Sequence, residues 1–244
     1  MTPGTVVDPR SNHLLASLED DELARITPHL EPVWLPRPTE LEGVNEPVTH
    51  AYFPTNGVAS IVALGEDGQS VDTGMIGREG MTGLALYLGT GQTPTRTIVQ
   101  VPLTGLRIRA DALRRELDFG GTITKLLRRH TQVLLVTMAQ LILCNRLHRM
   151  DQRAARWLLQ VDDRVDEKPF DVTQEFLAEM IGVQRPALSV AMRQFKAAGL
   201  VAYSRGRIRI ADREGLAARS CTCAEVIAAE GRRLDALEEG LAAS

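Results

Sequence analysis

The sequence predicts an α+β protein with an N-terminal β-roll of jelly-roll type, a long central helix and a C-terminal helix-turn-helix followed by a β-hairpin. Three observations support this class. Short β-type runs alternate with Gly turns over residues 31–109, residues 122–148 contain neither Gly nor Pro, and residues 171–211 place two short helical patterns before two β-type runs. The predicted domains are therefore residues 1–109, 110–150 and 151–244.

Length and charge distribution restrict the function classes. A chain of 244 residues is long enough for two domains. Residues 1–106 hold 5 Lys/Arg and 13 Asp/Glu, whereas residues 107–150 hold 9 and 3. A polyanionic partner is therefore expected to bind the back half. Residues 1–10 lack a signal-peptide pattern and no apolar run could span a membrane, so we expect a cytoplasmic protein without membrane contact.

The front half begins with a helical segment and continues as a series of short strands. Residues 12–30 have apolar residues at helical spacing. The β-type runs that follow are separated by turn signals such as Asn56-Gly57 and Gly105. These runs cover residues 33–35, 50–53, 58–64, 70–76, 97–101 and 106–108. Many short strands with Gly turns are typical of a roll or barrel.

A short helix at 112–117 and a long helix at 122–148 are predicted next. The long helix carries a half-apolar heptad seam. Such a seam favours pairing with the same helix of a second chain. The residues assigned to this dimer seam are Ile123, Leu127, Leu134 and Leu141. The alternative is that the helix packs against its own domain.

Residues 171–211 carry the motif from which we infer function. Thr173 is a good N-cap for a first helix, and Gly182 lies where a tight turn between helices requires a positive φ. A second helix begins at Gln184-Arg185-Pro186, where Pro is tolerated. This arrangement is a helix-turn-helix, whose second helix can enter the major groove of DNA. The apolar positions are Phe176, Leu177, Met180, Leu188, Met192 and Phe195.

Basic side chains follow the exposed face of the second helix and the hairpin. Arg185 lies in the first helical turn, where an arginine can bind guanine through two hydrogen bonds. The hairpin over residues 200–210 has Arg205 and Arg207 near its tip and would form a wing lying against phosphates. The alternative is a solvated basic hairpin with no ligand. The predicted DNA-binding residues are Thr173, Gln184, Arg185, Ser189, Arg193, Arg205 and Arg207.

Over roughly residues 12–215 the chain resembles the Crp/Fnr family of transcription regulators. The resemblance rests on Tyr52-Phe53-Pro54-x-x-Gly57 in the front half and on the 171–211 segment in the back half. It implies a cyclic-nucleotide-binding-like sensor domain, a long dimerising helix and a winged helix-turn-helix. It also implies a homodimer that regulates transcription from an inverted repeat in double-stranded DNA, with RNA polymerase as a further partner.

The chain departs from the family pattern at its DNA-reading positions. Arg185 matches the family arginine that reads guanine, but Pro186 replaces the glutamate that usually follows, and Val190 replaces a further arginine. Gln184, Ser189 and Arg193 are the candidates to substitute for the missing contacts. The family's target sequence therefore cannot be transferred to this chain.

The predicted sensor domain departs further from the family pattern than the DNA-reading positions do. The family's cyclic-AMP cassette corresponds here to Gly83, Leu84, Arg96 and Thr97, in which Leu84 replaces the glutamate that grips the ribose. These four residues are the candidate effector site, but the cofactor is unknown and cyclic AMP is disfavoured. The roll could instead bind a different small molecule, or serve as a structural or protein-interaction module. No iron–sulfur cluster is expected, because the N-terminal region lacks clustered cysteines.

Cysteine usage and motif content argue against a metal site and an enzyme. Cys144 is isolated, and Cys221-x-Cys223 has no second ligand pair nearby in the sequence. We interpret all three as ordinary reduced thiols, with a metal or redox site as the alternative, and we predict no metal ligand. The sequence contains no P-loop, no Gly-x-Ser-x-Gly and no His-Glu-x-x-His, so we predict a non-enzymatic protein.

Overall fold

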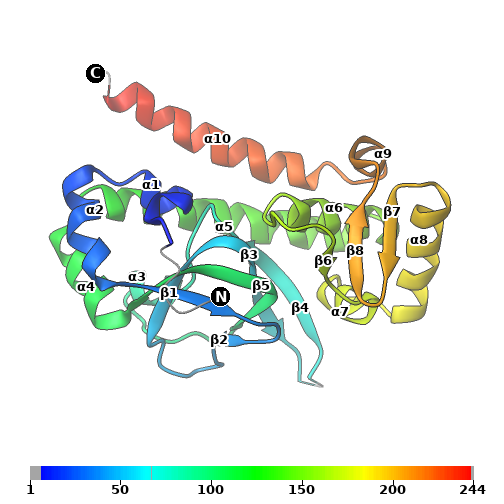
Figure 1. Cartoon of the computed structure of the whole chain (residues 1–244), viewed down its shortest axis with the longest axis horizontal. Helices are drawn as coiled ribbons and strands as arrows, with labels where there is room; N and C mark the ends of the chain where they lie inside the picture. Colours follow the sequence, from blue (N-terminus) through cyan, green and yellow to red (C-terminus); the bar gives the residue numbers. More distant parts are fainter. Residues whose placement is uncertain (1–6, 67, 243–244) are drawn as a thin grey trace.

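The computed structural model describes residues 7–66 and 68–242 of the chain (Figure 1). The N-terminal part contains a sheet and four short helices. Its strands are β1 (Leu30–Leu35), β2 (Glu40–Glu42), β3 (His50–Leu64), β4 (Ser70–Ile76) and β5 (Arg96–Arg109). Its helices are α1 (His13–Ala16), α2 (Asp20–Ile26), α3 (Leu84–Tyr87) and α4 (Ala110–Phe119), with 3-10 turns at Pro9–Ser11 and Thr27–His29.

The larger sheet has the order β1-β5-β3-β4, with β2 also paired to β5, and every pair is antiparallel. Each of the long strands β3 and β5 replaces two shorter predicted strands. The predicted turn at Asn56-Gly57 is instead an irregularity within β3. Gly57 has φ +95°, and a Cβ atom there would lie 2.3 Å from the carbonyl oxygen of Pro102 on β5. The glycine therefore permits a close approach of two bent strands instead of ending one of them.

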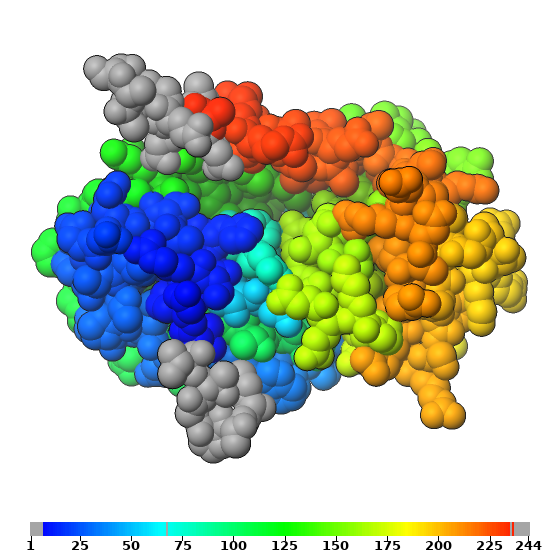
Figure 2. Space-filling model, turned by 45° about the horizontal axis from the view of Figure 1, so that its top comes forward, coloured from blue at the N-terminus to red at the C-terminus, as the bar shows by residue number. Residues whose placement is uncertain are grey.

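The long helix α5 (Thr122–Leu147) runs along the molecule and connects the roll to the C-terminal part. The last helix, α10 (Cys223–Ala242), runs back beside it in the opposite direction (Figure 1). Figure 2 shows α10 lying over α5 on this face of the molecule. Ile227 of α10 is buried and lines a small internal cavity together with Leu141 of α5. Of the residues predicted on one side of the last helix, the side chains of Leu237 and Leu241 lie outside the described residues.

The C-terminal part begins with α6 (Met150–Asp162). Three helices and a small sheet lie between α6 and α10. These elements are β6 (Phe170–Asp171), α7 (Gln174–Met180), α8 (Arg185–Ala197), β7 (Val201–Ser204), β8 (Arg207–Ile210) and α9 (Arg213–Ala218). The small sheet has the order β6-β8-β7. Trp157 of α6 is fully buried in a core that also includes Val58 and Val101 of the roll. The C-terminal part is therefore packed directly against the roll, and the two share one apolar core.

Within residues 7–66 and 68–242, no helix is long and apolar enough to span a lipid bilayer. The limits of the predicted domains at 109 and 150 remain our proposal. They fall where β5 passes into α4 and where α5 passes into α6.

Candidate nucleic-acid interface

Local capping and a glycine turn set the geometry of the helix-turn-helix. The hydroxyl of Thr173 is the N-cap of α7 and accepts a hydrogen bond from the backbone N–H of Phe176 at 3.2 Å. Gly182 lies in the turn between α7 and α8 with φ +62°, a conformation that glycine adopts without strain. The two helices therefore meet at a fixed angle determined by local sequence.

Helix α8 has one buried face and one exposed face. Leu188, Met192 and Phe195 are at most 3% exposed and anchor the helix in the core. Arg185 and Arg193 lie on the exposed side. This face is open to a ligand, as the second helix of a helix-turn-helix requires.

Val190 also lies on the exposed face of α8 and is 45% exposed. In the sequence, Val190 stands out only as the replacement of a family arginine, and it is not among the predicted contacts. An exposed apolar side chain on a major-groove helix can pack against the methyl group of thymine. Val190 is therefore a candidate for reading A·T pairs.

Two further predicted residues lie on α8 or at its N-cap, and one of them links the two helices in the free protein. The Ser189 hydroxyl donates a hydrogen bond to Oε1 of Gln174 on α7 at 2.9 Å. Gln184 is the N-cap residue of α8 and is exposed, although its side chain makes no capping hydrogen bond. Ser189 therefore links the two helices, while the Gln184 amide remains accessible at the start of α8.

The wing is a hairpin of β7 and β8 whose turn is made by Arg205 and Gly206, both with positive φ. Arg205 is exposed at the tip. Arg207 forms an ion pair with Asp171, with 3.1 Å between Nε and Oδ1, and donates a hydrogen bond to the carbonyl oxygen of Pro169. Arg207 must therefore exchange or share this partner if it is to contact a phosphate.

The structure brings part of the predicted set into a single concave surface. Thr173, Arg185 and Arg207 line one groove between α7, the start of α8 and the wing. Arg193 lies further along α8 and Arg205 lies at the wing tip, and neither lines this groove. The strand β6, which the sequence analysis missed because it has only two residues, pairs with β8 and supports the wing.

The four candidate effector residues do not all face the same space. Gly83, Leu84 and Thr97 line a cavity of about 320 Å³ in the roll. Arg96 instead pairs with Glu40, with 3.7 Å between Nε and Oε2. The cavity also contains a carboxylate that the sequence analysis did not identify: Oε1 of Glu42 accepts a hydrogen bond from the backbone N–H of Gly83 at 2.7 Å. Burial raises the pKa of Glu42, although this hydrogen bond opposes the rise.

The four seam residues are buried within a single chain. Ile123 and Leu127 pack in the core formed with the N-terminal helices, and Leu134 packs against the roll. Leu141 is 6% exposed and lies against α6 and α10 through the internal cavity. These residues have almost no surface left for a second chain. Their burial favours the alternative noted above, packing of α5 on its own chain, while their assignment to a dimer seam stays a prediction.

Comparisons with known proteins agree with this architecture. The Crp-like helix-turn-helix domain family matches residues 152–219. A CRP-like cAMP-activated global transcriptional regulator of Mycobacterium tuberculosis is 23% identical over 218 residues, covering 85% of this chain and 96% of that protein. The fold is similar to that of FixK2 from Bradyrhizobium japonicum, with a TM-score of 0.66, 15% identity and coverage of 79% and 98% of the two chains.

A second solved structure also has a similar fold. It is that of CLP, a c-di-GMP-responsive global regulator from Xanthomonas campestris, with a TM-score of 0.61, 16% identity and coverage of 79% and 99%. The fold and the matched domain together define the class of DNA-binding transcription regulators. Residues 152–219 carry a Crp-like helix-turn-helix domain, and the chain as a whole is distantly similar to CRP-like transcription regulators. The predicted resemblance and fold class are therefore confirmed.

Proposed function

We propose that the protein regulates transcription as a homodimer that binds an inverted repeat, with α8 of each chain in the major groove. The observation that carries this proposal is the exposed face of α8, which presents Arg185, Val190 and Arg193 and lies beside the arginine-bearing wing. A two-fold dimer would place its two α8 helices in successive major grooves, roughly 34 Å apart. Such a regulator would work in the cytoplasm and contact RNA polymerase.

The exposed side of α5 is the surface we propose for dimerisation. Leu135 and Ile142 are one heptad apart and are 57% and 73% exposed. Ala139 lies between them on the same side and is also exposed. This stripe could form a coiled-coil seam with the same helix of a second chain, because it is free of the contacts that bury the predicted seam.

The dimer surface is tested by charge insertion. The double variant Leu135→Lys and Ile142→Lys should convert the dimer into a monomer in analytical ultracentrifugation, because two desolvated ammonium groups oppose association. The matched control is Val44→Lys, which changes an exposed apolar residue of the roll that is not on α5. An unchanged dimer in the double variant would place the interface elsewhere.

Base reading is tested at Arg185. Arg185→Ala should weaken binding to a selected site by roughly 1–3 kcal/mol while changing binding to a scrambled duplex much less. Arg232→Ala on α10 is the matched control, because it removes one exposed arginine away from α8 and the wing. Equal losses on both duplexes would mean that Arg185 contacts only phosphate.

A second proposal concerns the cavity of the roll. Among the described residues, its lining includes the Glu42 carboxylate but no lysine, arginine or histidine. A phosphate group would meet a negative charge there without a compensating cation. The effectors of the relatives that respond to cAMP or c-di-GMP therefore cannot be assigned to this chain by analogy. We infer an uncharged or cationic small molecule with apolar surface as the ligand of this cavity.

Calorimetric titration tests this second proposal. Cyclic AMP and c-di-GMP should give no heat of binding to the purified dimer, and a library of neutral and cationic compounds should contain binders. Glu42→Gln should weaken cationic binders selectively. Saturable binding of cyclic AMP that depends on residues of this cavity would overturn the inference.

A further inference from the structure

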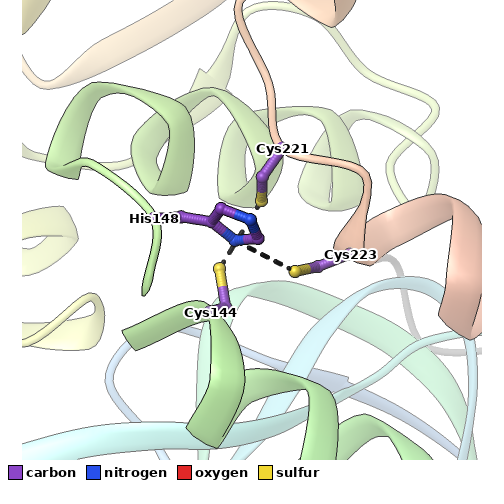
Figure 3. Close-up of side chains that lie close together, drawn as sticks. All are labelled: Cys144, His148, Cys221 and Cys223. Atoms are coloured by element: carbon purple, nitrogen blue, oxygen red, sulfur yellow. Dashed lines mark hydrogen bonds between the residues drawn. The ribbon is translucent and has the colours of Figure 1, made fainter. Parts of the chain in front are cut away.

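The three cysteines and one histidine converge at the joint between α5 and the DNA-binding domain (Figure 3). Cys144 and His148 belong to the last turn of α5 and its C-cap, whereas Cys221 lies between α9 and α10 and Cys223 is the first residue of α10. One potential ligand atom from each of the four residues lies within 4.8 Å of all the others. Residues that are 77 positions apart in the chain thus form one compact group.

From this geometry we propose that Cys144, His148, Cys221 and Cys223 bind one zinc-type divalent cation in a closed tetrahedral site. Three thiolates and one imidazole are a common ligand set of structural zinc sites. Zinc–ligand bonds of roughly 2.0–2.3 Å place the corners of a tetrahedron roughly 3.5–3.8 Å apart. The Sγ atoms of Cys144 and Cys221 are 3.5 Å apart, and Sγ of Cys223 is 3.3 Å from Nδ1 of His148.

The spacing favours a single ion over an iron–sulfur cluster. Ligands of one ion share a single coordination sphere, whereas the ligands of a cluster are divided among two or more iron atoms, so that the four cannot all lie close together. All four ligand atoms here lie within 4.8 Å of one another. The site is also closed, because four protein ligands leave no open position for a substrate.

The surroundings of the group provide hydrogen-bond donors that metal-bound thiolates would use. Cys144 and Cys223 are 0% exposed and Cys221 is 7% exposed. The side-chain amide of Gln140 donates to Sγ of Cys223 at 3.7 Å, and the backbone N–H of Cys223 donates to Cys221. Donors of this kind orient and stabilise metal-bound thiolates.

The charges near the group also favour a bound cation held by thiolates. When the ion binds, each of three thiols releases a proton to solvent as its sulfur bonds the metal, and His148 donates a lone pair, so no atom is oxidised or reduced. The loaded site then carries a single negative charge. Arg156 of α6, which is 4% exposed, acts electrostatically on Cys144 and Cys221, and so does Arg153. These guanidinium groups would offset the charge of the loaded site.

The site would act as a clamp. It joins the end of α5 to the start of α10 next to the junction with α6, whose N-cap is Arg149. A bound ion would therefore hold α10 against α5 and fix the angle at which the DNA-binding domain leaves the long helix. Neither the site nor the clamping of α10 depends on the proposed DNA function.

Metal content and a cobalt titration test the site directly in the full-length protein. The purified protein should contain one zinc per chain, and the chelated protein should bind one equivalent of Co²⁺ with thiolate-to-cobalt charge-transfer bands and intense tetrahedral d–d bands. Cys223→Ser should weaken Co²⁺ binding by at least about 100-fold, and Gln140→Ala by roughly 10- to 100-fold. Thr222→Ala, an exposed residue between two ligands, is the matched control and should bind as the wild type does.

Three results would overturn the proposal. They are iron with acid-labile sulfide in the purified protein, a Cys144–Cys221 disulfide as the native state, or three freely reactive thiols without stoichiometric Co²⁺ binding. Because the wild-type titration decides among these, a variant that fails to fold leaves the test intact. Hydrogen exchange in α10 tests the clamp: residues 224–234 should exchange at least about tenfold faster after chelation, and equal rates would refute the clamp.

Discussion

Asp72 carries the strongest prediction about stability. It lies on β4, is 6% exposed, and lines the small internal cavity between the roll and α6. Its Oδ1 accepts a hydrogen bond from the backbone N–H of Gly74 at 2.9 Å. Burial raises the pKa of Asp72 to about 6 from an ordinary 3.8, although the charge of Arg156 opposes this rise. The ionised carboxylate is therefore poorly solvated at the contact between the two domains.

The magnitude follows from linkage. Each pKa unit corresponds to about 1.4 kcal/mol, so a rise from 3.8 to about 6 means that ionised Asp72 destabilises the folded state by about 3 kcal/mol. Between these two pH values the folded state binds more protons than the unfolded state. The contribution of Asp72 to stability therefore declines as pH rises from 3.8 to 6 and stays low above pH 6.

Asp72→Asn should consequently raise the free energy of unfolding at pH 7.5 by up to about 3 kcal/mol and have little effect near pH 4. Urea unfolding followed by fluorescence of the buried Trp157 measures this, at one chain concentration throughout because the protein is proposed to be a dimer. Asp171→Asn, an exposed carboxylate, is the control. A variant that is destabilised at pH 7.5, or a stability difference that does not depend on pH, would refute the reasoning.

Three further changes test separate parts of the structure. Asp171→Asn removes the exposed partner of Arg207, so affinity for DNA should rise by up to about fivefold at low salt, as measured by fluorescence anisotropy; a loss of affinity would mean that the pair must stay intact. Gly57→Ala should destabilise the protein by more than about 2 kcal/mol in urea unfolding, because its Cβ would clash with Pro102 at φ +95°; a neutral result would show that β3 and β5 can separate there. Thr173→Ala should cost about 1 kcal/mol of stability through loss of the N-cap, and Thr173→Ser should restore it.

The helix-turn-helix could be predicted because its signals are local. Thr173, Gly182 and the apolar spacing of Leu188, Met192 and Phe195 each act within a few residues, and the structure contains α7 and α8 where this pattern places them. The wing followed from a second local pattern, two β-type runs around Arg205-Gly206.

Long-range features were harder to predict. A heptad pattern shows that one face of α5 is buried, but it does not say whether that face meets the same chain or another. Leu134 and Leu141 pack within the chain. The exposed Leu135 and Ile142 do not stand out from the other apolar residues of α5 in the sequence. The internal glycines of β3 and β5 resembled turn signals because glycine is favoured both in turns and at irregularities within strands.

The cysteine group shows the same limit. Cys221-x-Cys223 has only two ligands in its local sequence, and the other two lie at the end of α5, in its last turn and at its C-cap. Only the path of the chain after α9, which returns α10 along α5, brings the two pairs together. Glu42 likewise enters the roll cavity from β2, far in sequence from Gly83.

Selection of binding sites from a random DNA pool, followed by measurement of affinity and stoichiometry on the enriched duplex, tests the central claim most directly. The account predicts enrichment of an inverted repeat whose half-sites lie about one helical turn apart, bound by two chains without added cyclic AMP. A pool in which no sequence is enriched, or a site occupied by a single chain, would contradict it.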